Sequence, residues 1–195
     1  MIAVKEEEQY FTPEEYFIWE EQQLEKHELI NGRVYAMTGG TQNHSGIKIN
    51  IISLMKAHLR GSQCKVFNSD LKVNIVDTSN YTYPDLSVTC DERDRQQATY
   101  ITYPCLIVEV LSPSTEAYDR GKKFAMYRRN PNLIDYVLVS SEEMAIDIYH
   151  KNEAGDWLIL SYRAGDVVEL KSIDFSVPIE HVYEEIVFDL LPDAR

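Results

Sequence analysis

Three stretches of the chain have the pattern of polar and apolar residues that is typical of helices. The first begins at Thr12-Pro13, an N-cap residue followed by proline at the first helical position, and its apolar residues continue to about Lys26. Residues 43–60 repeat apolar side chains every three or four positions, which predicts a helix with one buried side. A third helix is predicted over residues 116–129, because Pro113-Ser114-Thr115 stops a strand and supplies an N-cap.

Shorter segments alternate or are continuously apolar, which indicates strands. Residues 27–37 alternate around Asn31-Gly32, a dipeptide typical of tight hairpin turns. Apolar runs in the middle of the chain predict strands within residues 64–76, 82–90, 105–113 and 133–140. After residue 142, short alternating pieces separated by glycine turns predict antiparallel strands. The pattern therefore predicts a single α/β domain over residues 1–195, with a mixed sheet flanked by helices and antiparallel strands near the C-terminus.

The segment LIVEVL, residues 106–111, is apolar except for Glu109. A charge buried in such a strand is costly unless it is paired or binds a metal ion. Asp85 lies near the start of the preceding strand, and adjacent strands can bring two carboxylates close together. Oxygen ligands of this kind are those that Mg²⁺ prefers, so we expect Asp85 and Glu109 to bind a divalent cation. The alternative is a structural role, in which Glu109 pairs with a buried lysine or arginine.

The third predicted helix carries the basic segment DRGKKFAMYRR. Lys122 and Lys123 are adjacent and point about 100° apart on a helix, so only one of them can face a site at the strand end. Lys123 shares a face with Tyr127, and helical side chains lean towards the N-terminus, so Lys123 can reach back to Glu109. A lysine there can orient water or stabilise negative charge on phosphorus. The alternatives are an exposed lysine and a tyrosine that only packs.

Composition limits the class of protein. The chain has 195 residues, 44% of them apolar, which is enough for one domain with a sizeable core. No stretch has the length of a membrane span, and the first 17 residues lack the pattern of a secretory signal. Cys64, Cys90 and Cys105 are odd in number and form no CxxC pair. We therefore expect a cytoplasmic protein with no membrane partner, no disulfide framework and no cysteine-rich zinc site.

The net charge of −13 argues at first against a nucleic-acid partner, but the charge is unevenly distributed. Residues 31–139 carry ten acidic and thirteen basic residues, and the acidic excess lies in the two ends. Either the ends form an ordinary solvated acidic surface, or they keep the protein soluble while the middle of the chain binds a polyanion.

Several motifs together resemble those of the PD-(D/E)XK nuclease superfamily and, more closely, its Uma-type restriction endonuclease family. They are YPDLSV and CLIVEVLSPSTEAYDRGKKFAMY, supported by HELINGRVYAMTGGTQNHSGI, VFNSDLKV and LIDYVLVS. The resemblance covers nearly the whole chain. It implies a restriction-endonuclease-like fold, with a mixed central sheet flanked by helices.

The resemblance assigns roles to individual residues. Asp85 matches the superfamily's motif aspartate and Glu109 its second acidic ligand. The superfamily lysine normally follows two residues after that acid, where this chain has Leu111. In the resembling family the lysine lies on the next helix, which selects Lys123 here. Glu28 matches an early acidic position that often binds metal or water, the alternative being an exposed residue beside the hairpin.

The resemblance implies metal-dependent hydrolysis of phosphodiester bonds in DNA. Mg²⁺ or Mn²⁺ would bind Asp85, Glu109 and the carbonyl of Val110, with Glu28 as a further ligand. His44 and Asp70 also occupy positions typical of the family, although a helix-capping role for His44 and a structural role for Asp70 are the alternatives. The residues expected to contact phosphate groups are His44, Lys48, Arg120, Lys122 and Arg128.

Two other functions remain open at this stage. The displaced lysine and the strong acidity leave room for a weak or inactive nuclease-fold module that binds nucleic acid or protein. A metal-dependent hydrolase of RNA or another phosphoester is the third hypothesis. Nucleases of this superfamily often act as dimers, so a homodimer is compatible with the resemblance, although the sequence shows no interface.

Overall fold

The structure is a computed structural model that describes residues 10–37, 39–76 and 79–188. Its largest sheet has six strands in the order β11-β10-β9-β8-β6-β3. Strands β8 and β9 are parallel and the other neighbours antiparallel, so the central sheet is mixed, as the sequence predicts. The strands are β3 (Lys65–Asn68), β6 (Leu86–Thr89), β8 (Leu106–Leu111), β9 (Asp135–Ser140), β10 (Ala145–Lys151) and β11 (Trp157–Arg163).

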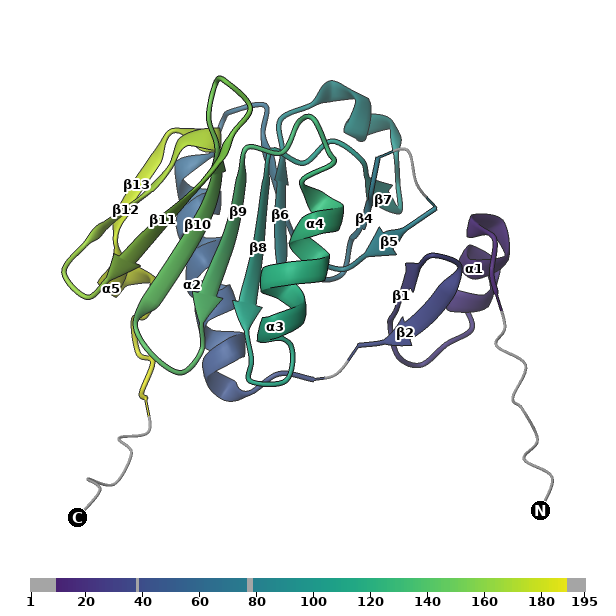
Figure 1. Ribbon diagram of the computed structural model, residues 1–195, viewed down its shortest axis with the longest axis horizontal. Helices are drawn as coiled ribbons and strands as arrows, with labels where there is room; N and C mark the ends of the chain where they lie inside the picture. Colours follow the sequence, from purple (N-terminus) through teal and green to yellow (C-terminus); the bar gives the residue numbers. More distant parts are fainter. Residues whose placement is uncertain (1–9, 38, 77–78, 189–195) are drawn as a thin grey trace, which may run out of the picture.

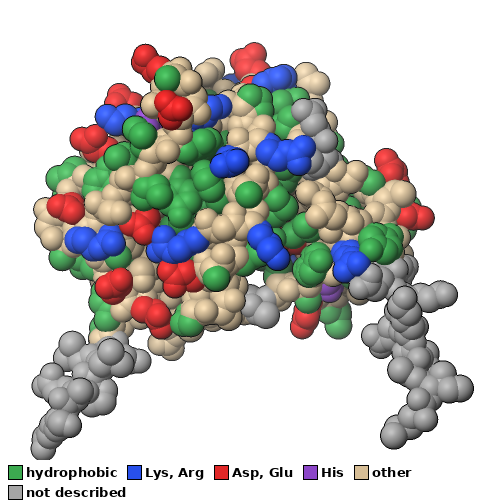
Figure 2. Space-filling view, viewed as in Figure 1, with side chains coloured by type: hydrophobic (Ala, Val, Ile, Leu, Met, Phe, Trp, Pro, Cys, Tyr) green, Lys and Arg blue, Asp and Glu red, His purple; other side chains and the backbone are tan. Residues whose placement is uncertain are grey.

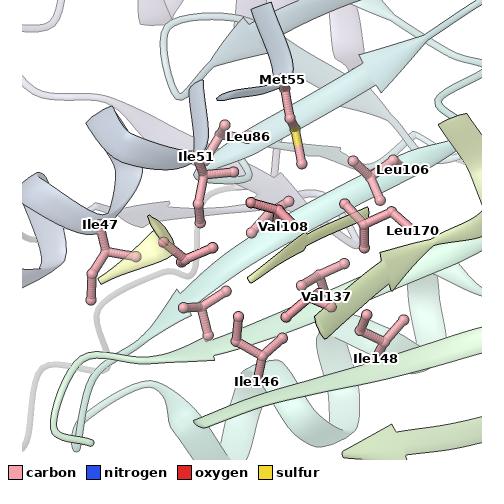
Figure 3. Packing of buried hydrophobic residues seen from close by; sticks show 14 of the residues in the cluster. Ile47, Ile51, Met55, Leu86, Leu106, Val108, Val137, Ile146, Ile148 and Leu170 are labelled. Atoms are coloured by element: carbon pink, nitrogen blue, oxygen red, sulfur yellow. The ribbon is translucent and has the colours of Figure 1, made fainter. Parts of the chain in front are cut away.

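Helices cover both faces of this sheet (Figure 1). Helix α2 (Gln42–His58) lies on one face, and the helical segment that follows β8 lies on the other. Ile47, Ile51 and Met55 of α2 pack against the strands that carry Leu86 and Val108 (Figure 3). The segment after β8 consists of α3 (Glu116–Tyr118), a π-helical turn η2 (Asp119–Lys123) and α4 (Phe124–Tyr127). The C-terminal elements close the α2 side of the core and are β12 (Val167–Leu170), η3 (Lys171–Ile173), β13 (Phe175–Pro178) and α5 (Ile179–Val182).

A second sheet has five short strands in the order β2-β1-β5-β4-β7. Helix α1 (Pro13–Glu20) packs its Tyr16 into the aromatic core beneath it, and η1 (Glu92–Gln96) precedes β7. The predicted hairpin is present, and Asn31 and Gly32 have the positive φ angles of 53° and 80° that a tight turn requires. The strands are β1 (His27–Ile30), β2 (Arg33–Ala36), β4 (Lys72–Asn74), β5 (Tyr81–Thr82) and β7 (Tyr100–Ile101).

Three predicted elements differ in extent. Helix α1 starts as predicted, with Thr12 in a capping box, but ends at Glu20 rather than near Lys26. The strand predicted over residues 64–76 is two strands in different sheets, because the backbone N–H of Asp70 donates to the Asn68 side chain in a turn between them. The strand predicted over residues 82–90 is likewise divided into β5 and β6. Asp70 also pairs with Lys26, a contact that fits the structural alternative for this residue.

The prediction of no disulfide framework has to be corrected for one pair of cysteines. Cys64 and Cys90 are disulfide-bonded. Lys65 of β3 is opposite Thr89 of β6 in an antiparallel pair, so the residues just outside that pair also face each other. The number of cysteines in a sequence does not show which of them face each other across paired strands. Disulfides are commonest in oxidising compartments, and a cytoplasmic location therefore stays a prediction.

The surface has a mixed character. On the face shown in Figure 2, lysine and arginine side chains are scattered among acidic and apolar ones. In the part of the chain that the structure describes, no helix has both the length and the apolar character needed to cross a membrane. The expectation of no secretory signal concerns residues 1–9 in part, which lie outside the described residues.

Candidate active site

The two predicted carboxylates lie next to each other at the start of β6. Leu86 of β6 is opposite Val108 of β8, so Asp85 and Glu109 are the next pair along the two strands. The backbone N–H of Asp85 lies 3.4 Å from Glu109 Oε2, and the N–H of Val110 donates to Asp85 Oδ2 at 2.8 Å. Each carboxylate thus contacts the backbone beside the other, and the strand register alone brings them together.

Lys123 contacts Glu109 and is surrounded by acids. Its Nζ atom is 2.9 Å from Glu109 Oε1, 3.4 Å from Glu28 Oε1 and 3.8 Å from Asp119 Oδ1. All four side chains are at most 10% exposed. Glu28 is therefore buried rather than exposed beside the hairpin, and its Oε1 also accepts a hydrogen bond from the N–H of Tyr83 at 3.0 Å. The single ammonium group of Lys123 therefore contacts three carboxylates, which come from β1, β8 and η2.

Asp119 and Lys123 lie at the two ends of a π-helical turn. A π-helical turn widens the backbone locally, and such turns often occur at functional sites. Here it spans Asp119–Lys123, and the side chains at both of its ends are buried. Tyr136 of β9 donates its hydroxyl to the carbonyl of Asp119 at 2.9 Å and so anchors the turn to the sheet. Tyr127 packs in the core and bonds Thr82 through its hydroxyl, which is the structural alternative considered for it.

Asp85 has a second set of neighbours on α2. His44 Nε2 lies 3.2 Å from Asp85 Oδ2, and Lys48 Nζ lies 3.2 Å from Asp85 Oδ1. Thr41 caps α2 through its hydroxyl, so the His44 side chain does not cap the helix and is directed at the carboxylate instead.

The pKa values of the acids in the site are shifted in opposite directions, depending on their burial and on the charges beside them. Burial raises the pKa of Glu109 well above its usual range, and the neighbouring carboxylates of Asp85 and Asp119 add to this rise against the charge of Lys123. Burial likewise raises the pKa of Asp119. Burial also acts on Asp85, but the hydrogen bond and charge of His44 and the charge of Lys48 outweigh it and lower its pKa. The Lys123 pKa is well above its usual value, because the surrounding carboxylates outweigh the effect of burial.

The donor atoms fit a divalent cation. Glu109 Oε1 is fully buried and accepts no hydrogen bond of good geometry from the described residues, although the Lys123 ammonium lies 2.9 Å away. A carboxylate oxygen with unused lone pairs beside a second carboxylate is suitable for a hard cation that keeps several waters. Among the described residues, no three His, Cys, Asp or Glu side chains already converge as a complete metal cluster. A cation here would therefore rest on Asp85, Glu109, a backbone carbonyl such as that of Val110, and water.

These side chains lie in a cleft of about 1300 Å³. Its cationic lining consists of Lys26, Lys48, Lys122 and Lys123, together with His44. Two of the predicted phosphate-contacting residues lie elsewhere. Arg120 bonds Glu116 at 2.7 Å and Asp147 of β10 at 2.8 Å, and Arg128 is exposed outside the cleft lining.

The sequence interpretation missed Asp119. Its spacing of four residues before Lys123 is the one available signal, since residues four apart on a helix are neighbours. The interpretation also assigned His44 and Lys48 to phosphate and did not foresee that both would contact Asp85. The cause is that α2 and β6 meet only through the packing of the core.

The sequence is similar to that of a protein family and to those of two Synechocystis proteins. Residues 13–180 match the family Uma2, described as "Putative restriction endonuclease". The uncharacterized protein slr1290 of Synechocystis is 58% identical over 177 residues, covering 91% of this chain and 93% of that protein. The uncharacterized protein sll1609 of the same organism is 34% identical over 151 residues, or 76% of this chain and 85% of that protein.

A solved structure supports the architecture. It is a putative nuclease belonging to DUF820 from Anabaena variabilis, with a TM-score of 0.75. It is 16% identical and covers 91% of this chain and 99% of its own, so the likeness concerns the fold alone. The family match extends over most of the chain and includes the strands and helices that carry the candidate site. The chain belongs to the Uma2 family.

Proposed function

We propose that this protein is a metal-dependent endonuclease that hydrolyses phosphodiester bonds in DNA. The observation that carries the proposal is the buried Glu109, which lies beside Asp85 and 2.9 Å from Lys123 in the cleft. An acid, a second acid and a lysine at one strand end are the groups that the family motif requires. The family description supplies the reaction class, and the geometry supplies residues able to perform it.

Each residue has a distinct role in the proposal. Asp85 and Glu109 would hold the cation, with the carbonyl of Val110 as a further oxygen donor, and Glu28 would join them only by turning away from Lys123 and the Tyr83 N–H. A bound Mg²⁺ or Mn²⁺ supplies a more acidic water and neutralises charge on the scissile phosphate. Lys123 donates hydrogen bonds to the oxygen on which negative charge develops. Because its own pKa is high, it stays cationic at neutral pH.

In this proposal, lysine side chains that line the cleft bind the DNA backbone. Lys48 and Lys122 line it, and both are suited to contact phosphates on either side of the scissile bond. Arg128 is exposed and available for a more distant phosphate, whereas Arg120 would first have to give up its bonds to Glu116 and Asp147. The cleft rather than a broad basic surface is therefore the proposed binding site.

A plasmid-nicking assay tests the proposal. Supercoiled DNA is incubated with Mg²⁺ or Mn²⁺ and with the wild type, Glu109→Ala or Lys123→Ala. We expect no cleavage by Glu109→Ala and almost none by Lys123→Ala. The matched control is Asp147→Ala, which removes a carboxylate on β10 outside the cleft lining and should still cut DNA. Thermal melting of each variant separates loss of the site from loss of the fold.

The same assay can contradict the proposal. If Glu109→Ala cuts DNA as well as the wild type, the assigned site is wrong. Single-stranded RNA and a small phosphodiester, tested at low salt, identify a hydrolase with another substrate. A wild type that cuts none of these substrates in either metal is a non-catalytic member of the family.

A further inference from the structure

We propose that His44 is a direct ligand of the cation, so that the site binds a divalent transition metal such as Mn²⁺ more tightly than Mg²⁺. The inference rests on the proposed metal-dependent function and adds a nitrogen donor to its oxygen ligands. It departs from the sequence interpretation, which assigned His44 to phosphate.

The spacing of the two donor atoms supports this assignment. His44 Nε2 lies 3.2 Å from Asp85 Oδ2. Two ligands at neighbouring positions of an octahedral ion, each bonded at about 2.1 Å, are about 3 Å apart. Lys48 contacts the other carboxylate oxygen, Oδ1, and so does not separate His44 from Oδ2. The imidazole nitrogen and the carboxylate oxygen are thus already spaced as two ligands of one ion.

The backbone at Gly40 fixes the direction of the imidazole. A Cβ atom at this position would lie 2.5 Å from Nδ1 and 2.9 Å from Cγ of His44. The chain therefore passes so close to the ring that only glycine leaves it in place. With Gly40 against one part of the ring and Asp85 at Nε2, the side chain is held towards the carboxylates, and only 15% of it is exposed.

The buried oxygen of Glu109 supplies an independent observation. Within the described part of the chain, Glu109 Oε1 accepts no hydrogen bond of good geometry, although Lys123 Nζ lies 2.9 Å away, and the Glu109 side chain is 5% exposed. The backbone N–H of Asp85 links Glu109 Oε2 to the same strand end that His44 faces. His44 Nε2 and Asp85 Oδ2 therefore form a ligand pair beside Glu109, although the three side chains do not already converge as a complete cluster among the described residues.

A nitrogen ligand changes which metal the site prefers. Mg²⁺ favours oxygen ligands and retains its waters, whereas affinity for mixed nitrogen and oxygen sites rises along the transition series from Mn²⁺ onwards. A site of carboxylates alone would bind Mg²⁺ and Mn²⁺ with less discrimination. His44 is thus the residue that would set metal preference.

Metal binding by the full chain, measured without DNA, tests the inference. The protein is stripped with EDTA and titrated with Mn²⁺ or Mg²⁺ by calorimetry, and the bound Mn²⁺ is examined by electron spin echo spectroscopy for coupling to nitrogen. We expect His44→Ala to weaken Mn²⁺ binding by about 10- to 100-fold, to change Mg²⁺ binding by less than about threefold, and to abolish the nitrogen coupling.

Two further variants guard against a folding defect. Gly40→Ala keeps every donor atom but displaces the ring, and should weaken Mn²⁺ binding in the same direction. His181→Ala removes an exposed histidine on α5 and should change nothing. Circular dichroism of each variant checks that the fold is retained.

The outcomes separate this inference from the proposed function. If the wild type binds Mn²⁺ without nitrogen coupling, and His44→Ala binds it equally well, His44 is not a ligand while the carboxylate site stands. If the wild type binds neither ion, both the inference and the metal-dependent function are wrong.

Discussion

Two ion-pair clusters include residues of the same π-helical turn, and they differ in the number of acidic side chains for each basic one. Lys123 is buried against three carboxylates, those of Glu109, Glu28 and Asp119. Arg120, three residues earlier, lies on another side of the turn and is 34% exposed, between Glu116 and Asp147.

The difference indicates which cluster has a structural role. Arg163 shares Asp147 with Arg120, so the outer cluster has two cations for two acids. The Lys123 cluster has three acids for one cation, and the raised pKa values of Glu109 and Asp119 reflect the cost of placing that many carboxylates in a buried site. The proposed metal ion would compensate the excess of acids in this cluster, whereas the outer cluster is already balanced.

The largest difference in stability between the two clusters should appear when Lys123 is removed from one and Arg120 from the other. Lys123→Met leaves three buried carboxylates without their ammonium, and we expect a loss of about 3 kcal/mol in the free energy of unfolding at pH 8. Arg120→Met, on the partly exposed pair, should cost about 1 kcal/mol or less. Urea unfolding in EDTA measures both. Equal losses would mean that the two clusters do not differ in the way the contacts indicate.

Removing one acid from each cluster should give effects of opposite sign. The pKa of Asp119 is raised by burial, so its charged form destabilises the folded protein once the pH exceeds that raised value. Asp119→Asn should therefore stabilise the metal-free protein by about 1 kcal/mol at pH 8, and the gain should shrink as the pH falls towards the ordinary aspartate value.

Asp147→Asn is the counterpart in the outer cluster. Although burial acts to raise the pKa of Asp147, hydrogen bonds from Ser161 and Arg120 lower it overall. Its charged form therefore stabilises the fold at neutral pH, and that contribution is lost as the pH falls through the lowered pKa. We expect Asp147→Asn to destabilise by about 0.5 kcal/mol at pH 8. Thermal melting at pH 8 and pH 5 tests both signs, and a stabilising Asp147→Asn would contradict the assignment.

The smallest effect is expected at Arg163. Its side chain is 55% exposed and its contact with Asp147 is 3.5 Å long. Arg163→Ala should change the free energy of unfolding by less than about 0.5 kcal/mol, and 0.5 M salt should remove even that difference. A larger effect that survives in salt would show that the outer cluster is more tightly coupled than its exposure indicates.

Local sequence signals predicted much of the fold. The Thr12 cap, the Asn31-Gly32 turn and the buried strand around Glu109 all act over a few residues, and all are present. The adjacency of Asp85 and Glu109 also follows from pairing consecutive central strands. What these features share is that neighbours in sequence, or in the next strand, determine them.

Features that depend on tertiary packing were not predicted. The π-helical turn is anchored by Tyr136 from β9, and the Cys64–Cys90 bond depends on the register of β3 against β6. His44 meets Asp85 only because α2 packs across the sheet. No local pattern contains these distances, so the sequence identified three acids and the lysine of the candidate site but missed Asp119 and the contacts of Asp85 with α2.

The π-helical turn makes the geometry of the candidate site depend on the number of residues in that turn. A π-helical turn holds about one residue more than an α-helical turn, so taking one residue, such as Gly121, out of it would restore ordinary α-helical winding. Asp119 and Lys123 would then be three residues apart instead of four, which changes their positions relative to Glu109 while the apolar packing of α4 stays in place. A single-residue insertion or deletion at this point would therefore alter the arrangement of charges around Glu109 without dismantling the core.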